Sequence, residues 1–475
     1  RNSIDQRVHA ATVPYGARRT WEARCPADGR WPVLDRYTSS DMRAVFSDQR
    51  RFENWRRIEL AVLAGYVHVG MVPEEVLAAA QRYACPSALS VNERERETAH
   101  DVVAFLLEWT AGMPAYVSSR VHRGLTSSDL VDTAQAIAVG DASALIMLQL
   151  DQLVTVLADH ALAHRDTARI GRTHGQYATR EVWGHRVADF AFAADRARTR
   201  LLRARDATLV AKISGTTGTY QQVPPEVETF ASQELGLQPV EVSTQVVMRD
   251  RLAEWIFALA AAATVCEAVA LEIRLGQRSE VAELAEGVGR SRAGSSSMPH
   301  KQNPIVSEKI CGLARLARSY VTPVLEGVAL WNERDLTHSS VERVAVADAA
   351  ALTEHVIGQT AAVMQQLIVR VDQMASRLQD ASAVVLSNAA LVRLTDAGLS
   401  YPEAWSVVKR ATDSSSDSDA AQFAAVLQEV ATSKGPELDP SWTRGLVHGD
   451  PLRLDQIFEA VDKLKRGTRS QLGSG

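Results

Sequence analysis

The chain has 475 residues, a length sufficient for more than one domain and for a large buried core. Its formal net charge of -5 leaves no basic footprint, so we expect no nucleic acid partner. Four cysteines, Cys25, Cys85, Cys266 and Cys311, lie far apart without metal-type pairing, which predicts no metal site and a reducing, cytoplasmic location. The most apolar run, residues 256–266, is shorter than the roughly 20 residues that span a membrane, so we expect no membrane segment.

Helical periodicity dominates the chain after an irregular beginning. Residues 1–35 show neither a secretory signal nor helical periodicity, and we expect an irregular N-terminal arm there. Strand patterns are nearly absent from the rest, which predicts an all-α fold. We divide it into an N-terminal helical domain (36–125), a central bundle of long helices (126–378) and a C-terminal helical domain (379–475), where serines and prolines separate shorter helices.

Two segments predict especially long helices. Thr126 and Asp129 have capping-box spacing, and apolar residues then recur at helical intervals from Leu130 onward. Residues 245–283 contain no proline and are interrupted only by Gly276, so we expect one helix of about 60 Å. Because this second segment is apolar on much of its circumference, it needs neighbours on several sides, as in a bundle that continues across subunits.

The segment from Gly289 to Glu308, GRSRAGSSSMPHKQNPIVSE, is too rich in glycine and serine to be a helix interior. Lys301 and Asn303 follow the serines, and a new apolar segment begins at Pro304. We expect a mobile loop over 287–304 that ends in a fixed anion-binding shelf. On composition alone, an ordinary serine-rich linker is an equal alternative.

The order of residues in this loop changes that balance. Gly-Ser-Ser-x-Met-Pro-x-Lys-x-Asn-Pro resembles the signature loop of the fumarase/aspartase superfamily, whose members eliminate a group from a substituted succinate or a close relative and usually release fumarate. Two further blocks, VHRGLTSSDLVDTA from Val121 and GRTHGQ from Gly171, resemble the first and second signature blocks of that superfamily. The resemblance implies a central bundle flanked by two smaller helical domains, a homotetramer with sites shared by three subunits, a small dicarboxylate substrate and no cofactor.

Shorter motifs resemble the adenylosuccinate lyase branch of this superfamily. They are Arg36-Tyr37, ETAHDVV at 97–103, STQ ending at Gln245 and WNERDLTHSSVER at 331–343. Taken alone, each could be a helix cap or a solvated face. The resemblance implies substrate contacts from these motifs at Arg36, Tyr37, His100, Asp101, Gln245, Arg334, Ser339 and Arg343.

The resemblance also implies catalytic roles. Ser295 matches the base that removes a proton beside a carboxylate, and His174 matches the general acid that protonates the leaving group. A serine hydroxyl is a poor base at neutral pH, so local N–H groups and positive charge would have to ionise it as the loop closes. Further substrate contacts are implied at a helix N-terminus, which suits a carboxylate, and in the loop; the residues are Thr126, Ser127, His122, Lys301 and Asn303.

Several positions depart from the adenylosuccinate lyase pattern. Ala99 and Gln302 replace arginines, Asn332 replaces a histidine, and Arg180 stands where relatives commonly have proline. These departures favour a specialised relative, a nitrosuccinate lyase of a bacterial biosynthetic pathway that releases nitrite and fumarate, with Arg180 as a fork for the nitro group. Adenylosuccinate lyase is the first alternative, and a 3-carboxymuconate cycloisomerase is the second. A structural or binding protein on the same fold is the non-enzymatic alternative.

Overall fold

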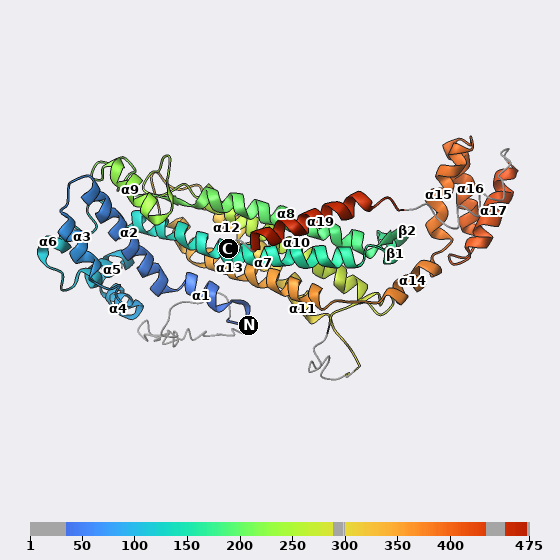
Figure 1. Ribbon diagram of the computed structural model, residues 1–475, viewed down its shortest axis with the longest axis horizontal. Helices are drawn as coiled ribbons and strands as arrows, with labels where there is room; N and C mark the ends of the chain where they lie inside the picture. The colour runs from blue at the N-terminus through green and yellow to red at the C-terminus, as the bar shows by residue number, and fades with distance from the viewer. Residues whose placement is uncertain (1–34, 288–297, 299, 434–451, 473–475) are drawn as a thin grey trace, which may run out of the picture.

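The computed structural model describes residues 35–287, 298, 300–433 and 452–472. This part of the protein is elongated, with long helices running along one axis and a group of shorter helices at each end (Figure 1). The predicted all-α class is confirmed. Of the predicted N-terminal arm, residues 1–34 lie outside the described residues, and so does most of the signature loop, including Ser295.

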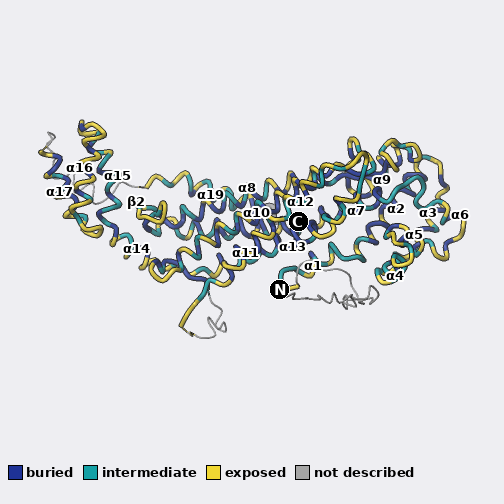
Figure 2. The backbone as a smooth tube through the Cα atoms, turned by 180° about the vertical axis from the view of Figure 1, so that it is seen from behind, coloured by how far each residue is buried: buried dark blue, intermediate teal, exposed yellow. Residues whose placement is uncertain are grey.

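The central bundle holds the largest buried core. Its helices pack side by side, α7 along α8 and α13, and α10 along α8, α11 and α13. Buried residues follow their inward faces, and exposed residues follow the outer surface (Figure 2). The bundle contains α7 (Ser127–Ala163), α8 (Trp183–Thr208), α10 (Asp250–Gly276), α11 (Ile305–Ser319), α12 (Val321–Glu326) and α13 (Thr337–Gln365).

Helices α7 and α10 are long and apolar enough to cross a membrane by length and composition alone. About half of each apolar window is buried within the molecule, 50% for α7 and 56% for α10. Both helices contribute many residues to the shared core. Their apolar character is therefore accounted for by packing in the centre of a helical bundle.

Helix α10 is shorter than the segment 245–283 that we expected to be one helix. At its start, the amide of Val247 donates to the carboxylate of Asp132 on α7, so the chain before Asp250 follows α7 instead of a helical path. At its end, the chain folds back over Gly276, where an added Cβ would lie 2.6 Å from a methyl carbon of Leu284. Contacts with other segments thus end the helix at both sides, which its own periodicity does not reveal.

The N-terminal group of helices has its own core, in which the rings of Phe52, Trp55 and Phe105 pack together. Its longest member, α2, contacts α9 on one side and α7 on another, so it joins this group to the bundle. The elements are η1 (Asp35–Tyr37), α1 (Ser40–Val45), α2 (Asp48–His68), α3 (Glu74–Gln81), α4 (Ala88–Thr98), α5 (Asp101–Thr110), α6 (Ala115–Ser118) and α9 (Pro225–Leu235).

The strands that the structure describes form three two-stranded sheets. An antiparallel hairpin of β1 (Ala168–Thr173) and β2 (Gln176–Val182) follows α7 and leads into α8. No strand pattern in the sequence predicted this hairpin. The two short pairs, one parallel and one antiparallel, are β3 (Val210–Ala211) with β4 (Gln238–Pro239), and β5 (Leu284–Ala285) with β6 (Ile368–Val369).

A third core lies at the end of the molecule near the hairpin. It is formed by η2 (Val384–Leu386), α15 (Ser387–Asp396), α16 (Tyr401–Ser414) and α17 (Ala420–Thr432), which α14 (Val371–Asp380) connects to the bundle. The predicted domain 379–475 is too long, because α19 (Asp455–Leu472) returns to pack on α7 and α8 (Figure 1). Burial of Phe458 and Val461 explains this return.

Candidate active site

The N-terminus of α7 is fixed by a buried ion pair. Thr126 and Asp129 form the predicted capping box, with the Thr126 amide donating to the Asp129 carboxylate at 2.6 Å. The other carboxylate oxygen accepts from the fully buried Lys212 ammonium at 2.7 Å and from the amides of Ser214 and Gly215. One carboxylate therefore ties the start of α7, with Thr126, to the loop that follows α8.

Four of the residues expected to contact substrate meet at this helix start. His100 is the N-cap of α5, and its Nε2 lies 3.3 Å from the hydroxyl of Ser127. Asp101, the next residue, accepts from Arg343 of α13 at 2.7 Å. Burial raises the pKa of Asp101, but the charges of Arg343 and Arg51 outweigh burial and hold that pKa below its ordinary value. Asp101 is therefore a carboxylate held between two cations.

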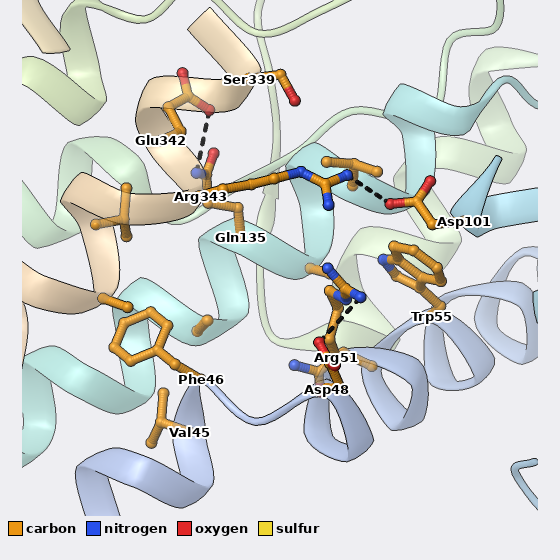
Figure 3. Close-up of a pocket in the computed structure, with 16 residues that line it drawn as sticks. Val45, Phe46, Asp48, Arg51, Trp55, Asp101, Gln135, Ser339, Glu342 and Arg343 are labelled. Carbon is orange, nitrogen blue, oxygen red and sulfur yellow. Dashed lines mark hydrogen bonds and ion pairs between the residues drawn. The ribbon is translucent and has the colours of Figure 1, made fainter. Parts of the chain in front are cut away.

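A cavity of about 200 Å³ opens beside this ion pair (Figure 3). Arg343 extends across it toward Asp101, while Arg51 and Trp55 of α2 lie on its other side. Ser339, another expected substrate contact, also lines it. Arg51 and Trp55 were not predicted as site residues, because on an amphipathic helix their four-residue spacing is typical of ordinary packing.

The position of Arg343 depends on a charge network below the cavity. Arg249 donates to both carboxylate oxygens of Asp132 at 2.7 and 2.8 Å and to Glu342 at 2.9 Å, and all three side chains are buried. Because Asp132 belongs to α7 and Glu342 to α13, the network fixes these two helices against each other. Arg343 follows Glu342 directly and is placed by the same contact.

Gln245 and Arg334, both expected to contact substrate, are neighbours. The Arg334 guanidinium donates to the Gln245 amide oxygen at 3.1 Å, and the Gln245 amide group donates to the carbonyl of Thr216 at 3.1 Å. The hydroxyl of Thr244 donates to the carbonyl of Glu333 at 2.8 Å. These hydrogen bonds join three separate loops. None of them links these loops to Asp101 or Arg343.

Left-handed backbone conformations fall repeatedly in the motifs. Such a conformation is uncommon for residues other than glycine and costs of order 1 kcal/mol, so it persists where surrounding contacts enforce it, often at functional sites. Among the described non-glycine residues with positive φ, Tyr220 and Ala282 lie outside the motifs, and the others belong to motif segments: Ala99, His122, His174 and Asn332.

His174 lies far from this cluster. It occupies the turn of the β1–β2 hairpin, is exposed and has φ of 55°. Helix α7, with 37 residues and hence a length of about 55 Å, separates the hairpin from Thr126. Arg180 is exposed on β2 opposite Ile170, four residues, or about 13 Å of strand, beyond Gln176, where β2 begins after the His174 turn. One chain therefore brings His174 near neither the Thr126 end nor Arg180.

The stem of the signature loop is held by two side chains. Gln277 accepts from the amide of Glu286 and donates to the carbonyl of Gln302. The carboxylate of Glu286 accepts from the amides of Val306 and Ser307 at the start of α11. The amides at the start of α11, where the expected anion-binding shelf ends, are therefore already bound to the carboxylate of Glu286. Lys301 is exposed, Asn303 half-buried, and both precede that helix.

Arg36 and Tyr37 belong to η1, which packs against a different part of α13. The ring of Tyr37 packs edge-on against His355, with centroids 5.4 Å apart. His355 is twelve residues, or about 18 Å of helix, from Arg343. The structure therefore does not bring this pair to the Arg343 ion pair within one chain.

Comparison with known proteins agrees with this architecture. Residues 37–318 match a family described as Lyase. Adenylosuccinate lyase of Synechocystis sp. is 36% identical over 402 residues, covering 84% of this chain and 92% of that protein. The adenylosuccinate lyase of Thermotoga maritima is 39% identical over 378 residues, covering 80% and 88%. The crystal structure of a fumarate lyase from Mesorhizobium sp. BNC1 has a TM-score of 0.78 at 25% identity, covering 92% of this chain and 100% of that one.

A bundle of long helices that carries separated, loop-borne motifs defines the class of the protein as a helical-bundle lyase. The chain belongs to the matched lyase family, in the adenylosuccinate lyase-like branch of the fumarase/aspartase superfamily. It is a carbon–nitrogen lyase of that superfamily, which removes the non-enzymatic alternative. The family resemblance recognised in its motifs is confirmed.

Proposed function

We propose that the protein cleaves adenylosuccinate to fumarate and AMP. The observation that carries this proposal is the cluster at the start of α7, where Ser127, His100 and the Asp101–Arg343 pair meet from three parts of the chain. Each belongs to a motif of the adenylosuccinate lyase branch, and the relatives named above cover most of this chain. Arg343 offers the planar fork that suits a phosphate or carboxylate.

The proposed chemistry is a β-elimination. Ser295, in its ionised form, removes a proton from the carbon beside a carboxylate, and the electron pair left behind forms the carbon–carbon double bond of fumarate as the carbon–nitrogen bond breaks. His174 gives its proton to the departing nitrogen. Lys301 and Asn303, with the amides at the start of α7, stabilise the negative charge that develops on the carboxylate. Deprotonated His174 and protonated Ser295 then exchange protons with solvent.

We further propose that the protein works as a homotetramer. The start of α7 and the His174 hairpin are separated by the length of α7, about 55 Å, whereas the reacting groups of a single site must lie within a few ångströms of the substrate. Copies of the chain packed side by side in opposite directions would bring one start next to another chain's hairpin. The exposed apolar side chains Leu148 and Phe257 on α7 and α10 are suited to such packing.

Nitrosuccinate is the second candidate, and Ala99 is the observation that favours it. Ala99 replaces the arginine of the branch, is exposed and has no side chain that could reach a nucleotide. The comparisons do not support nitrosuccinate and fit adenylosuccinate better, which reverses the order predicted from the sequence. The position of Arg180, far from His174 along the hairpin, also weakens the argument for a nitro-binding fork.

The test follows fumarate by its ultraviolet absorbance after purified protein is incubated separately with adenylosuccinate, nitrosuccinate and aspartate. We expect turnover of adenylosuccinate at a kcat/KM at least about tenfold above that of the other two, a difference of 1.4 kcal/mol. Efficient release of fumarate and nitrite from nitrosuccinate, with adenylosuccinate untouched, would overturn the proposal in favour of the second candidate.

A further inference from the structure

One face of α2 holds the turn that precedes α7. Glu59 and Tyr66 lie seven residues apart, two helical turns, and therefore on the same side of α2. The Tyr66 hydroxyl donates to the carbonyl of Arg123 at 2.9 Å, and Glu59 contacts His122. An added Cβ at Gly124 would lie 2.7 Å from the carbonyl oxygen of Gln222, so the turn is also confined from its other side.

The carboxylate of Glu59 forms hydrogen bonds with His122 at two positions. One oxygen lies 2.7 Å from the ring Nδ1, and the other accepts from the His122 amide at 2.9 Å. Glu59 is buried, with 3% of its surface exposed, while the His122 side chain is 23% exposed. A buried carboxylate accepts but does not donate, so Nδ1 carries a hydrogen, and the ring orientation is set by two hydrogen bonds.

The opposite ring nitrogen of His122 is available. Nε2 makes no hydrogen bond to any residue that the structure describes, although the ring is fixed at Nδ1. His122 adopts a left-handed backbone with φ of 55°, which the contacts of its amide and ring enforce. His122 lies four residues before Thr126, so its ring is carried by the turn that leads into α7.

The charges around His122 favour its protonated form. Burial lowers the pKa of the ring, but the hydrogen bond and charge of Glu59, with a smaller contribution from Asp129, outweigh burial and raise it above the ordinary value. Glu59 approaches from α2 and Asp129 from α7, where its own charge is paired with Lys212. The adjacent Arg123 has its guanidinium over the Tyr66 ring, 5.4 Å from the centroid.

We propose that Glu59 is a positioning residue for catalysis: it holds His122 by Nδ1 so that the Nε2–H donates to an anionic group of the substrate at the start of α7. The inference rests on the proposed function, because it needs an anionic substrate bound there. It adds to that function a residue that lies on another helix and touches the substrate only through His122. Glu59 belongs to none of the motifs of the sequence analysis.

The test compares Glu59→Gln with Tyr66→Phe in the full-length protein. Both substitutions alter a contact between α2 and the turn, but only Glu59→Gln removes the negative charge that lies beside the His122 ring. Activity that needs protonated His122 is lost as the pH rises through its pKa. Removing Glu59 leaves burial dominant and lowers that pKa, so the fall of kcat/KM should move to lower pH by roughly 1 to 3 units. Tyr66→Phe should leave the midpoint in place.

A second measurement does not require Glu59→Gln to fold. In the unaltered protein labelled with ¹⁵N-histidine, the His122 ring signals, assigned by their loss in His122→Asn, should titrate with a pKa above the ordinary value of about 6.5. A pKa at or below that value would overturn the inference, as would equal pH shifts in Glu59→Gln and Tyr66→Phe. This titration is made without substrate. Absence of adenylosuccinate turnover would therefore refute the proposed function but would not change the measured pKa of His122.

Discussion

The two ends of α7 present opposite kinds of surface. At its start, Ser127, His100, Asp101 and Arg343 contact one another, and charged groups beneath them are paired and buried. At its other end, His174 stands exposed at the tip of a hairpin. The first region is a cluster of polar side chains that contact their neighbours, whereas the second carries an exposed histidine with no partner among the described residues. Because the length of α7 separates the two ends, both can act on one substrate molecule only if they come from different chains.

The hairpin is nevertheless held firmly. Arg172 donates twice to Glu283, at 2.6 and 3.1 Å, and Arg169 bridges Glu181 and Glu272. These pairs line a cavity of about 850 Å³ between the hairpin, α8 and α10. Since the cations that line it are engaged by carboxylates, the cavity is better explained as support for the hairpin than as an anion site. His174 is therefore exposed on a fixed tip.

The largest expected effect is at neither end of α7 but at Ser295, the proposed base. Ser295→Ala should lower kcat by at least about 1,000-fold, because removal of a catalytic base deletes a step that no neighbour performs. Circular dichroism and light scattering should show an unchanged fold and assembly. Ser291→Ala, in the same segment but outside the signature, is the matched control and should stay within twofold of the parent. Residual Ser295→Ala activity within tenfold of the parent would show that another group is the base.

Mixing variants tests the separation of the two ends directly. His174→Ala and Ser295→Ala proteins, each inactive alone, should recover activity after subunit exchange, because some sites in mixed tetramers combine an intact histidine from one chain with an intact serine from another. Fumarate formation before and after exchange is the measurement, with each variant exchanged against itself as control. A fully active monomer in light scattering would contradict the shared arrangement.

Lys212→Met tests how far the first end depends on its buried ion pair. The change leaves the Asp129 carboxylate buried without its cation, and such a loss typically lowers the free energy of unfolding by about 3 to 5 kcal/mol. Denaturant unfolding measures the change, and Lys309→Met, at an exposed position, should alter it by less than about 0.5 kcal/mol. A loss below 1 kcal/mol for Lys212→Met would mean that the start of α7 is held by other contacts.

The sequence predicted the all-α class and the start of α7, because capping spacing and apolar periodicity are local. It did not predict the β1–β2 hairpin, where His174 and glycines interrupt any alternation. Nor could it predict Glu59, Arg51 or the return of α19. A buried carboxylate on an amphipathic helix has the same local pattern as a solvated one, and only the fold shows that it faces His122.

The smallest expected effect is that of Arg180→Ala on the hairpin, and it distinguishes adenylosuccinate from nitrosuccinate as the substrate. If adenylosuccinate is the substrate, Arg180→Ala should change the activation free energy for kcat/KM by no more than about 0.5 kcal/mol, since Arg180 is exposed and lies about 13 Å along β2 from the strand's start beside the His174 turn. If the guanidinium binds a nitro group, the same change should cost about 1.5 to 3 kcal/mol, the value of a hydrogen bond to a charged group. His174→Ala gives a parallel test. Adenylosuccinate needs a proton on its departing nitrogen, whereas nitrite leaves as a stable anion, so a large loss at His174 with none at Arg180 supports adenylosuccinate.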